Sequence, residues 1–156
     1  MQGYSMTRND RVDVTLSPMT ACDLEAVLDL WGQTEGVGLN ESDTPKQLRA
    51  FLDRNSGLSV IARDGPRLIG SVLCGHDGRR GYLHHLAVLP NYRGRGLGRQ
   101  MAETCLAALG ALGILKCNIF LYADNEPGER FWRQCGWSAR SDLKVLQRKT
   151  SPQGPA

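Results

Sequence analysis

Glycines and arginines alternate in one short segment past the middle of the chain, Arg93-Gly94-Arg95-Gly96-Leu97-Gly98-Arg99. Glycine lets backbone amides approach a ligand closely and permits positive φ angles. Consecutive amides at a turn and at the start of a helix bind anions, and neighbouring guanidinium groups add charge-assisted hydrogen bonds to phosphate. The segment therefore predicts a binding site for a phosphate-bearing ligand.

Other phosphate-binding classes do not fit this segment. The dinucleotide-binding pattern G-x-G-x-x-G requires glycine where the chain has Arg99, and the P-loop requires Gly-Lys followed by Ser or Thr. Nucleic-acid binding through the three arginines is disfavoured, because no stacking aromatics are interleaved with them. The formal net charge of +3 is also too small to argue for a nucleic-acid partner.

A strand leads into the segment and a helix follows it. The alternation of residues 82–89 indicates the strand, Pro90 ends it, and apolar residues keep helical spacing over about 96–112. Further strands are expected at 12–16, 58–62, 68–74 and 114–122, with late strand segments at 137–139 and 144–146. Further helices are expected at about 24–32, 45–54 and 126–135. This order predicts an α+β fold with a mixed central sheet flanked by helices, in which strands 82–89 and 114–122 are parallel.

The length and composition indicate one globular domain. The chain has 156 residues, 41% of them hydrophobic and 22% charged. We assign residues 11–149 to the domain, 1–10 to a flexible leader and 150–156 to a disordered tail. No apolar run approaches the ~18 residues that span a membrane, and the N-terminus lacks a signal-peptide core, so a cytoplasmic protein is expected. The five cysteines form no CxxC pair, which predicts reduced thiols and no metal site.

Several motifs together resemble those of the GCN5-related N-acetyltransferase (GNAT) superfamily. The loop fits the pattern Arg-x-x-Gly-x-Gly, and the strand before it reads Leu86-Ala87-Val88 with proline two residues later. Downstream, Asn125, Phe131-Trp132 and Gly136-Trp137 are similar to the family's N-x5-F-Y-x3-G-F pattern. The resemblance extends over about residues 12–148.

The resemblance implies a fold, a co-substrate and its binding residues. Family members bind acetyl-CoA between a splayed fourth and fifth strand, and the backbone of Leu86, Ala87 and Val88 would pair with the pantetheine arm as an added strand does. Asn125 would contact the cofactor arm and Trp132 would pack against it. The thioester would lie near a bulge in the strand, where an amine attacks it directly. The pyrophosphate would be held by the loop residues Arg93, Gly94, Arg95, Gly96, Leu97, Gly98 and Arg99.

The chain departs from the family at the usual acid and base positions. Tyr82 stands where many members have a catalytic glutamate, and His84 stands where some members have a histidine. A histidine near neutral pKa accepts protons, so His84 is our candidate general base, with Tyr82 beside it on the same strand face. His85 would then point to the opposite face in a structural role. Trp132 replaces the usual tyrosine acid, and Tyr122 is a candidate substitute.

The acceptor is expected to be a primary amine on a small molecule, a peptide N-terminus or a lysine. The connection 32–44 carries Glu35, Glu41 and Asp43, and carboxylates near a pocket mouth would favour a cationic amine. An alternative function is a CoA-binding regulatory module without turnover, because both usual acid and base positions differ. The protein is expected to be a monomer or a homodimer.

Overall fold

The computed structural model describes residues 13–151, so the expected leader at 1–10 and residues 152–156 of the expected tail lie outside the described residues. Five strands form one sheet in the order β1-β2-β3-β4-β5. The first three pairings are antiparallel, and β4 pairs with β5 in parallel. This confirms the predicted α+β fold with a mixed sheet. The strands are β1 (Val14–Pro18), β2 (Val60–Asp64), β3 (Arg67–His76), β4 (Arg80–Val88) and β5 (Lys116–Ile119).

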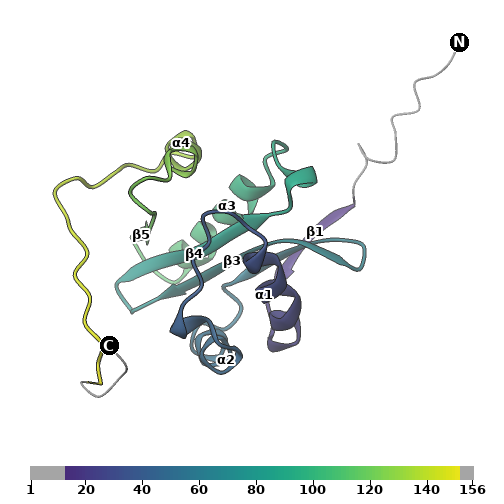
Figure 1. Ribbon diagram of the computed structural model, residues 1–156, viewed down its shortest axis with the longest axis horizontal. Coiled ribbons are helices and arrows are strands. Elements are labelled where there is room, and N and C mark those ends of the chain that lie inside the picture. The colour runs from purple at the N-terminus through teal and green to yellow at the C-terminus, as the bar shows by residue number, and fades with distance from the viewer. Residues whose placement is uncertain (1–12, 152–156) are drawn as a thin grey trace, which may run out of the picture. The chain divides into compact units, whose positions relative to one another are not determined.

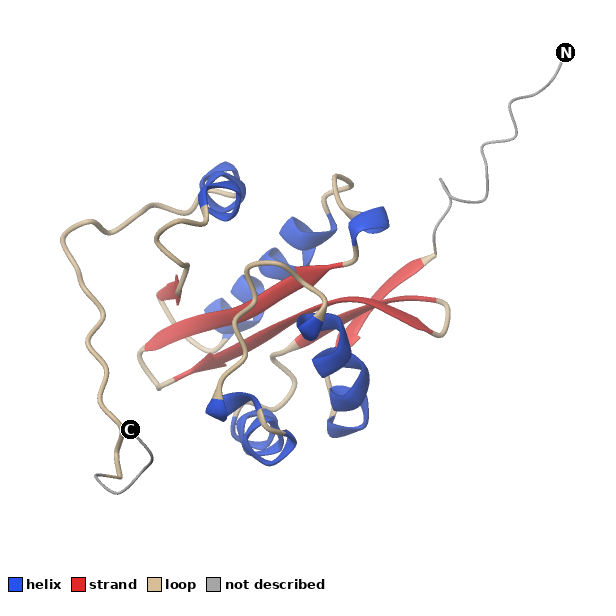
Figure 2. Ribbon diagram, in the orientation of Figure 1, coloured by secondary structure: helices blue, strands red, loops and turns tan. Residues whose placement is uncertain are grey.

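The described chain divides into two compact units, with the boundary after Tyr122. The first unit contains the whole sheet together with α1 (Leu24–Gly32), α2 (Pro45–Arg54) and α3 (Leu97–Ala111). Figure 1 shows α1 and α2 in front of this sheet and α3 behind it, and Figure 2 shows the same strands between the helices. The second unit contains α4 (Glu126–Gln134).

The core of the first unit lies between the sheet and the helices on each face. A fully buried side chain contributes about 1.5–3 kcal/mol of hydrophobic free energy relative to exposure, so these layers hold the unit together. The large side chains that exclude solvent almost completely include Val27, Trp31, Leu48, Ile69, Val72, Leu83, Met101 and Leu109.

Local signals set the helix ends where the sequence indicates. The Thr44 hydroxyl accepts a hydrogen bond from the Gln47 amide at 3.3 Å, and Pro45 occupies the first turn of α2. Gly136 follows α4 with φ of 92°, which confirms the predicted left-handed terminator.

The late strand segments expected at 137–139 and 144–146 are wrong. Among the described residues after α4 no strand is formed, and the side chains of Leu143, Val145 and Leu146 are 60%, 62% and 92% exposed. Alternation alone does not make a strand, because a strand also needs a hydrogen-bonded neighbour. β5 is likewise shorter than the expected 114–122, since its pairing with β4 stops at Leu83 and Ile119.

No helix among residues 13–151 is long and apolar enough to cross a membrane.

Candidate active site

A bulge interrupts β4 next to the proposed base. Ser71 pairs with Ala87 and Leu73 pairs with His84, so Val72 alone faces two residues of β4. The extra residue is His85, whose φ of 55° makes it the only described non-glycine residue with positive φ. A bulge of this kind bends its strand and redirects the side chains beside it.

The bulge places both histidines on the same face of the sheet. The ring centroid of His84 lies 6.2 Å from that of Phe51 in α2, and the centroid of His85 lies 4.9 Å from that of Trp31 in α1. Both helices cover the same face (Figure 1). The expectation that His85 points to the opposite face is therefore wrong, because alternation assumes an unbroken pleat.

The edge of β4 beyond the bulge is open. The last pair with β5 joins Leu83 to Ile119, and residues 84–88 pair only with β3 among the described residues. The two parallel strands therefore part after four pairs, in agreement with the predicted splay. An unpaired edge presents amide and carbonyl groups to which an extended polar ligand can add as a strand. Leu86, Ala87 and Val88 lie on this edge.

The glycine loop ends in an uncapped helix N-terminus. Gly94 and Gly96 have φ of 76° and 79°, and Gly96 directly precedes α3. No side chain of the described residues caps this terminus, and its first turn contains no acidic residue. A Cβ built at either glycine meets nothing within 4 Å. Free amides beside open space, at the positive end of a helix, fit a diphosphate.

Two side-chain contacts hold the loop. The Nε group of Arg93 donates to the Val88 carbonyl at 2.8 Å, which ties the loop to the end of β4. The Tyr92 hydroxyl donates to Oδ2 of Asp64 at 2.5 Å, which ties it to the end of β2. Arg95 lies with its guanidinium carbon 6.0 Å from the centroid of the Tyr92 ring. Leu97 is buried at the start of α3, whereas Arg99 is exposed.

His84 lies among aromatic rings. Its centroid is 6.2 Å from that of Tyr82 and 6.1 Å from that of Phe120, with interplanar angles of 9° and 29°. Burial lowers the pKa of His84 below its ordinary value of 6.5, the charge of His85 lowers it further, and Asp43 opposes both effects. Within the described part of the chain no hydrogen bond engages its imidazole. His84 is therefore a neutral imidazole near pH 7 that can accept a proton.

His85 is engaged with the connection between α1 and α2. Its Nε2 atom lies 2.9 Å from Oδ1 of Asp43, whose other oxygen accepts from the Asn40 amide at 3.0 Å. Asp43 is only 9% exposed. Asp43, expected among the carboxylates near a pocket mouth, is therefore buried and paired, whereas Glu35 and Glu41 are exposed.

The buried cysteines are not candidate nucleophiles. Cys22, Cys74, Cys105 and Cys117 are free thiols, and Cys74 and Cys105 are fully buried. A hydrogen bond with Cys105 raises the pKa of Cys74, and burial adds to this effect. Burial raises the pKa of Cys117 to about 12. Cys74 and Cys117 therefore stay protonated at neutral pH and are poor nucleophiles.

Asn125 and Trp132 belong to the second unit. The Asn125 side chain accepts from the Gly128 amide at 3.0 Å and so caps α4. Trp132 is 8% exposed, and its ring centroid lies 5.1 Å from that of Phe131 and 5.0 Å from that of Trp137. These contacts give both residues a structural role within their own unit.

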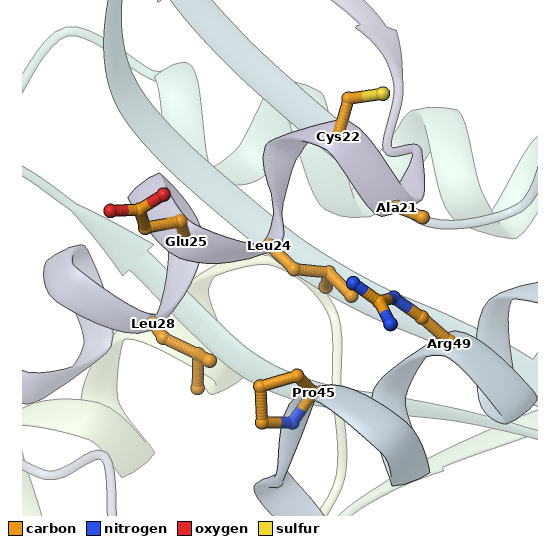
Figure 3. Close-up of a pocket in the computed structure, with 7 residues that line it drawn as sticks. All are labelled: Ala21, Cys22, Leu24, Glu25, Leu28, Pro45 and Arg49. Atoms are coloured by element: carbon orange, nitrogen blue, oxygen red, sulfur yellow. The ribbon is translucent and has the colours of Figure 1, made fainter.

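One cavity of about 410 Å³ lies between α1 and α2. Figure 3 shows Glu25 and Arg49 at it, together with apolar side chains from both helices. None of the residues that line it is a predicted site residue. The candidate active site therefore rests on β4, the loop after it and the rings around His84.

The resemblance implied a bulge in this strand, but four features of the region escaped sequence reasoning: the position of the bulge at His85, the pairing of Asp43 with His85, the position of Phe120 and the anchoring of Tyr92. Of these, only the position of Phe120 and the anchoring of Tyr92 had a signal in the sequence. Tyr92 directly precedes the Arg93 motif, and Phe120 belongs to the strand expected beside β4.

Comparisons with known proteins agree with this geometry. The profile of the family described as "Acetyltransferase (GNAT) family" matches residues 24–137. The chain is 30% identical over 127 residues to an acetyltransferase of Sodalis glossinidius, covering 81% of this chain and 89% of that protein. It is also 30% identical over 104 residues to an acetyltransferase of Pectobacterium atrosepticum, covering 67% of this chain and 73% of the relative.

Solved structures share the fold. Ard1 from Thermoplasma volcanium superposes with a TM-score of 0.73 at 14% identity, covering 83% of this chain and 86% of that one. The PaiA N-acetyltransferase from Thermoplasma acidophilum, solved in complex with coenzyme A, gives 0.68 at 19% identity, covering 78% and 87%.

Proposed function

Since the chain belongs to the acetyltransferase (GNAT) family, whose co-substrate is acetyl-CoA, we propose that it is an N-acetyltransferase acting on a primary amine. The observation that carries the proposal is a juxtaposition along β4. The neutral imidazole of His84, the open strand edge and the uncapped N-terminus of α3 follow one another within 14 residues of sequence, 84–97. A base, a ligand-binding edge and a phosphate site are the parts that acyl transfer from a CoA thioester requires.

The loop residues would hold the pyrophosphate. The amides at Gly96, Leu97 and Gly98 provide the uncapped terminus, and Arg93, Arg95 and Arg99 add positive charge around it. Gly94 allows the chain to turn with positive φ before the helix. The backbone of 86–88 would align the pantetheine arm.

His84 would act on the acceptor. When bound, acetyl-CoA supplies an acetyl group activated as a thioester. A primary amine is mostly an ammonium near pH 7, and it must lose a proton before its nitrogen attacks the acetyl carbonyl. His84 would accept that proton, directly or through a water molecule, because its lowered pKa leaves it neutral. Tyr82 stacks on His84 and limits its orientation, and Tyr122 is our candidate proton donor to the leaving sulfur.

Calorimetry and a turnover assay test the proposal together. Titration of coenzyme A into the protein should give a heat signal that fits binding at one site. Release of the free thiol from acetyl-CoA should become faster when a primary amine is added. Absence of any binding heat would overturn the assignment of the loop. Binding without thiol release, for every amine in a broad panel, would favour a CoA-binding regulatory module instead. We further propose that the protein is cytoplasmic, and that it is a monomer or homodimer without a nucleic-acid partner. Sedimentation analysis with and without RNA tests the oligomeric state and the lack of RNA binding.

A further inference from the structure

We propose that the acceptor is a primary amine that carries a flat apolar group, such as an aromatic ring, and that this group stacks on the rings around His84. This inference rests on the proposed function and names the substrate class of the same site. The surface that would hold the apolar group consists of Phe51, Tyr82 and Phe120, and we call it the ring surface.

The ring surface is built from three elements of the first unit. Tyr82 comes from β4, Phe51 from α2, and Phe120 directly follows β5. The centroids of Tyr82 and Phe120 are 6.1 Å apart with an interplanar angle of 22°, and each lies at a similar distance from His84. Phe51 meets His84 edge-on at 79°. Near-parallel rings offer their faces and edges to a further ring in the geometries that aromatic pairs prefer.

The ring surface lies where β4 and β5 part. The last pair of the two strands joins Leu83 to Ile119, and the next residue on each strand is His84 or Phe120. Phe120 keeps 60% of its surface exposed, and Tyr122, two residues further on, keeps 61%. Large exposed aromatic side chains beside a candidate base offer contact area that the apolar group of a substrate can bury.

The connection between α1 and α2 reaches the same region. A Cβ built on Gly38 would meet the hydroxyl of Tyr122, so the connection passes close to this side chain. Figure 1 shows the connection passing in front of β4. Leu39, the next residue, is 45% exposed. The connection therefore carries an exposed apolar side chain directly after its closest approach to Tyr122.

The carboxylates of this connection do not favour a polycationic acceptor. Asp43 is the carboxylate that favours the protonated form of His84. Both of its oxygens are already engaged, one with His85 and the other with the Asn40 amide. Glu35 and Glu41 are exposed. Exposed carboxylates in water attract cations weakly, whereas apolar contact with rings does not depend on charge. Recognition by the ring surface therefore favours an apolar group over a second ammonium group.

The experiment compares two primary amines, one of which carries an aromatic ring and the other a second ammonium group. The kcat/KM for acetylation is measured with 2-phenylethylamine and with 1,4-diaminobutane, for the wild-type chain, Phe120→Ala, Phe120→Leu and the control Leu115→Ala. Leu115 precedes β5 and is 88% exposed, so its removal deletes a similar apolar side chain outside the ring surface. We expect the wild type to prefer 2-phenylethylamine. Phe120→Ala should lower its kcat/KM by about ten-fold, Phe120→Leu by less, and Leu115→Ala should leave it unchanged.

Saturation-transfer NMR with 2-phenylethylamine gives a readout that does not need turnover. Preference for 1,4-diaminobutane, or equal loss in Phe120→Ala and Leu115→Ala, would overturn the inference. If no amine is acetylated but 2-phenylethylamine still binds the wild type and not Phe120→Ala, the ring surface stands and the proposed enzymatic function fails. If acetylation of other amines is fast while 2-phenylethylamine neither binds nor reacts, the function stands and the substrate class is wrong.

Discussion

His85 and Asp43 join the bulge of β4 to the connection between α1 and α2, with Nε2 of His85 lying 2.9 Å from Oδ1 of Asp43. The same carboxylate accepts from the Asn40 amide and so caps the 3-10 turn before α2. The His85 ring also packs against Trp31, whose indole donates to Oγ of Ser71 on β3 at 2.9 Å. The buried pair of His85 and Asp43 therefore holds the bulge of β4 against the connection between α1 and α2.

Asp43→Ala should lower the free energy of unfolding by about 2 kcal/mol, because it leaves the His85 and Asn40 donors without their buried acceptor. Urea denaturation measures this loss. Glu41→Ala is the matched control, since Glu41 is an exposed carboxylate of the same turn. In a double-mutant cycle with His85→Ala, the two losses should be less than additive by about 1 kcal/mol or more. Strict additivity would show that the pair makes no energetic contribution.

His84→Ala should lower kcat by about 10²-fold with little change in affinity for coenzyme A, which is the usual contribution of a positioned base. His76→Ala is the matched control, because His76 lies at the end of β3 and bonds the Gly78 amide. In the wild type, kcat/KM should fall on the acid side with a midpoint below the ordinary histidine pKa of 6.5, since burial lowers the pKa of His84. A midpoint at or above 6.5, or full activity of His84→Ala, would remove His84 from the mechanism.

The lowered pKa of His84 also makes stability depend on pH. Between its folded-state pKa and the ordinary value of 6.5, the unfolded chain binds more protons than the folded chain. The free energy of unfolding therefore rises with pH through this window and falls as the pH drops below 6.5. Urea midpoints measured across this range should show a smaller pH slope for His84→Ala than for the wild type. Equal slopes would contradict the prediction.

Local signals in the sequence were enough for strands β1 to β4 and for the left-handed turn before α3. Gly96 and Gly136 adopt the positive φ that their positions require, and Thr44 caps its helix. The orientation of His85 could not be predicted, because the bulge depends on how β3 registers against β4. The burial of Asp43 depends on a contact 42 residues away in sequence. The prediction of strands at 137–139 and 144–146 also failed because it depended on a distant contact, since a strand forms only when a partner strand is available.

Gly96→Ala should weaken coenzyme A binding by at least about ten-fold, because a Cβ would enter the open space beside the uncapped terminus of α3. Positive φ makes any alanine there strained by roughly 1–2 kcal/mol, so the control must carry the same strain. Gly65→Ala meets this need, since Gly65 has φ of 58° and open space around it in the turn between β2 and β3. Calorimetry should find full affinity in Gly65→Ala. Equal weakening in both variants would mean that strain, not phosphate contact, causes the effect.

The hydrogen bond from Tyr92 to Asp64 should position the glycine loop for the cofactor. Tyr92→Phe removes the donor and keeps the ring on which Arg95 rests, so the KM for acetyl-CoA should rise by about five-fold while kcat at saturation stays near the wild-type value. Asp64→Ala should have the same effect, and the double variant should be no worse than either single one. The hydrogen bond to Asp64 raises the pKa of Tyr92, so tyrosinate absorbance should show one residue titrating late in the wild type and earlier in Asp64→Ala. An unchanged KM with the expected shift in titration would show that the bond forms but does not position the loop.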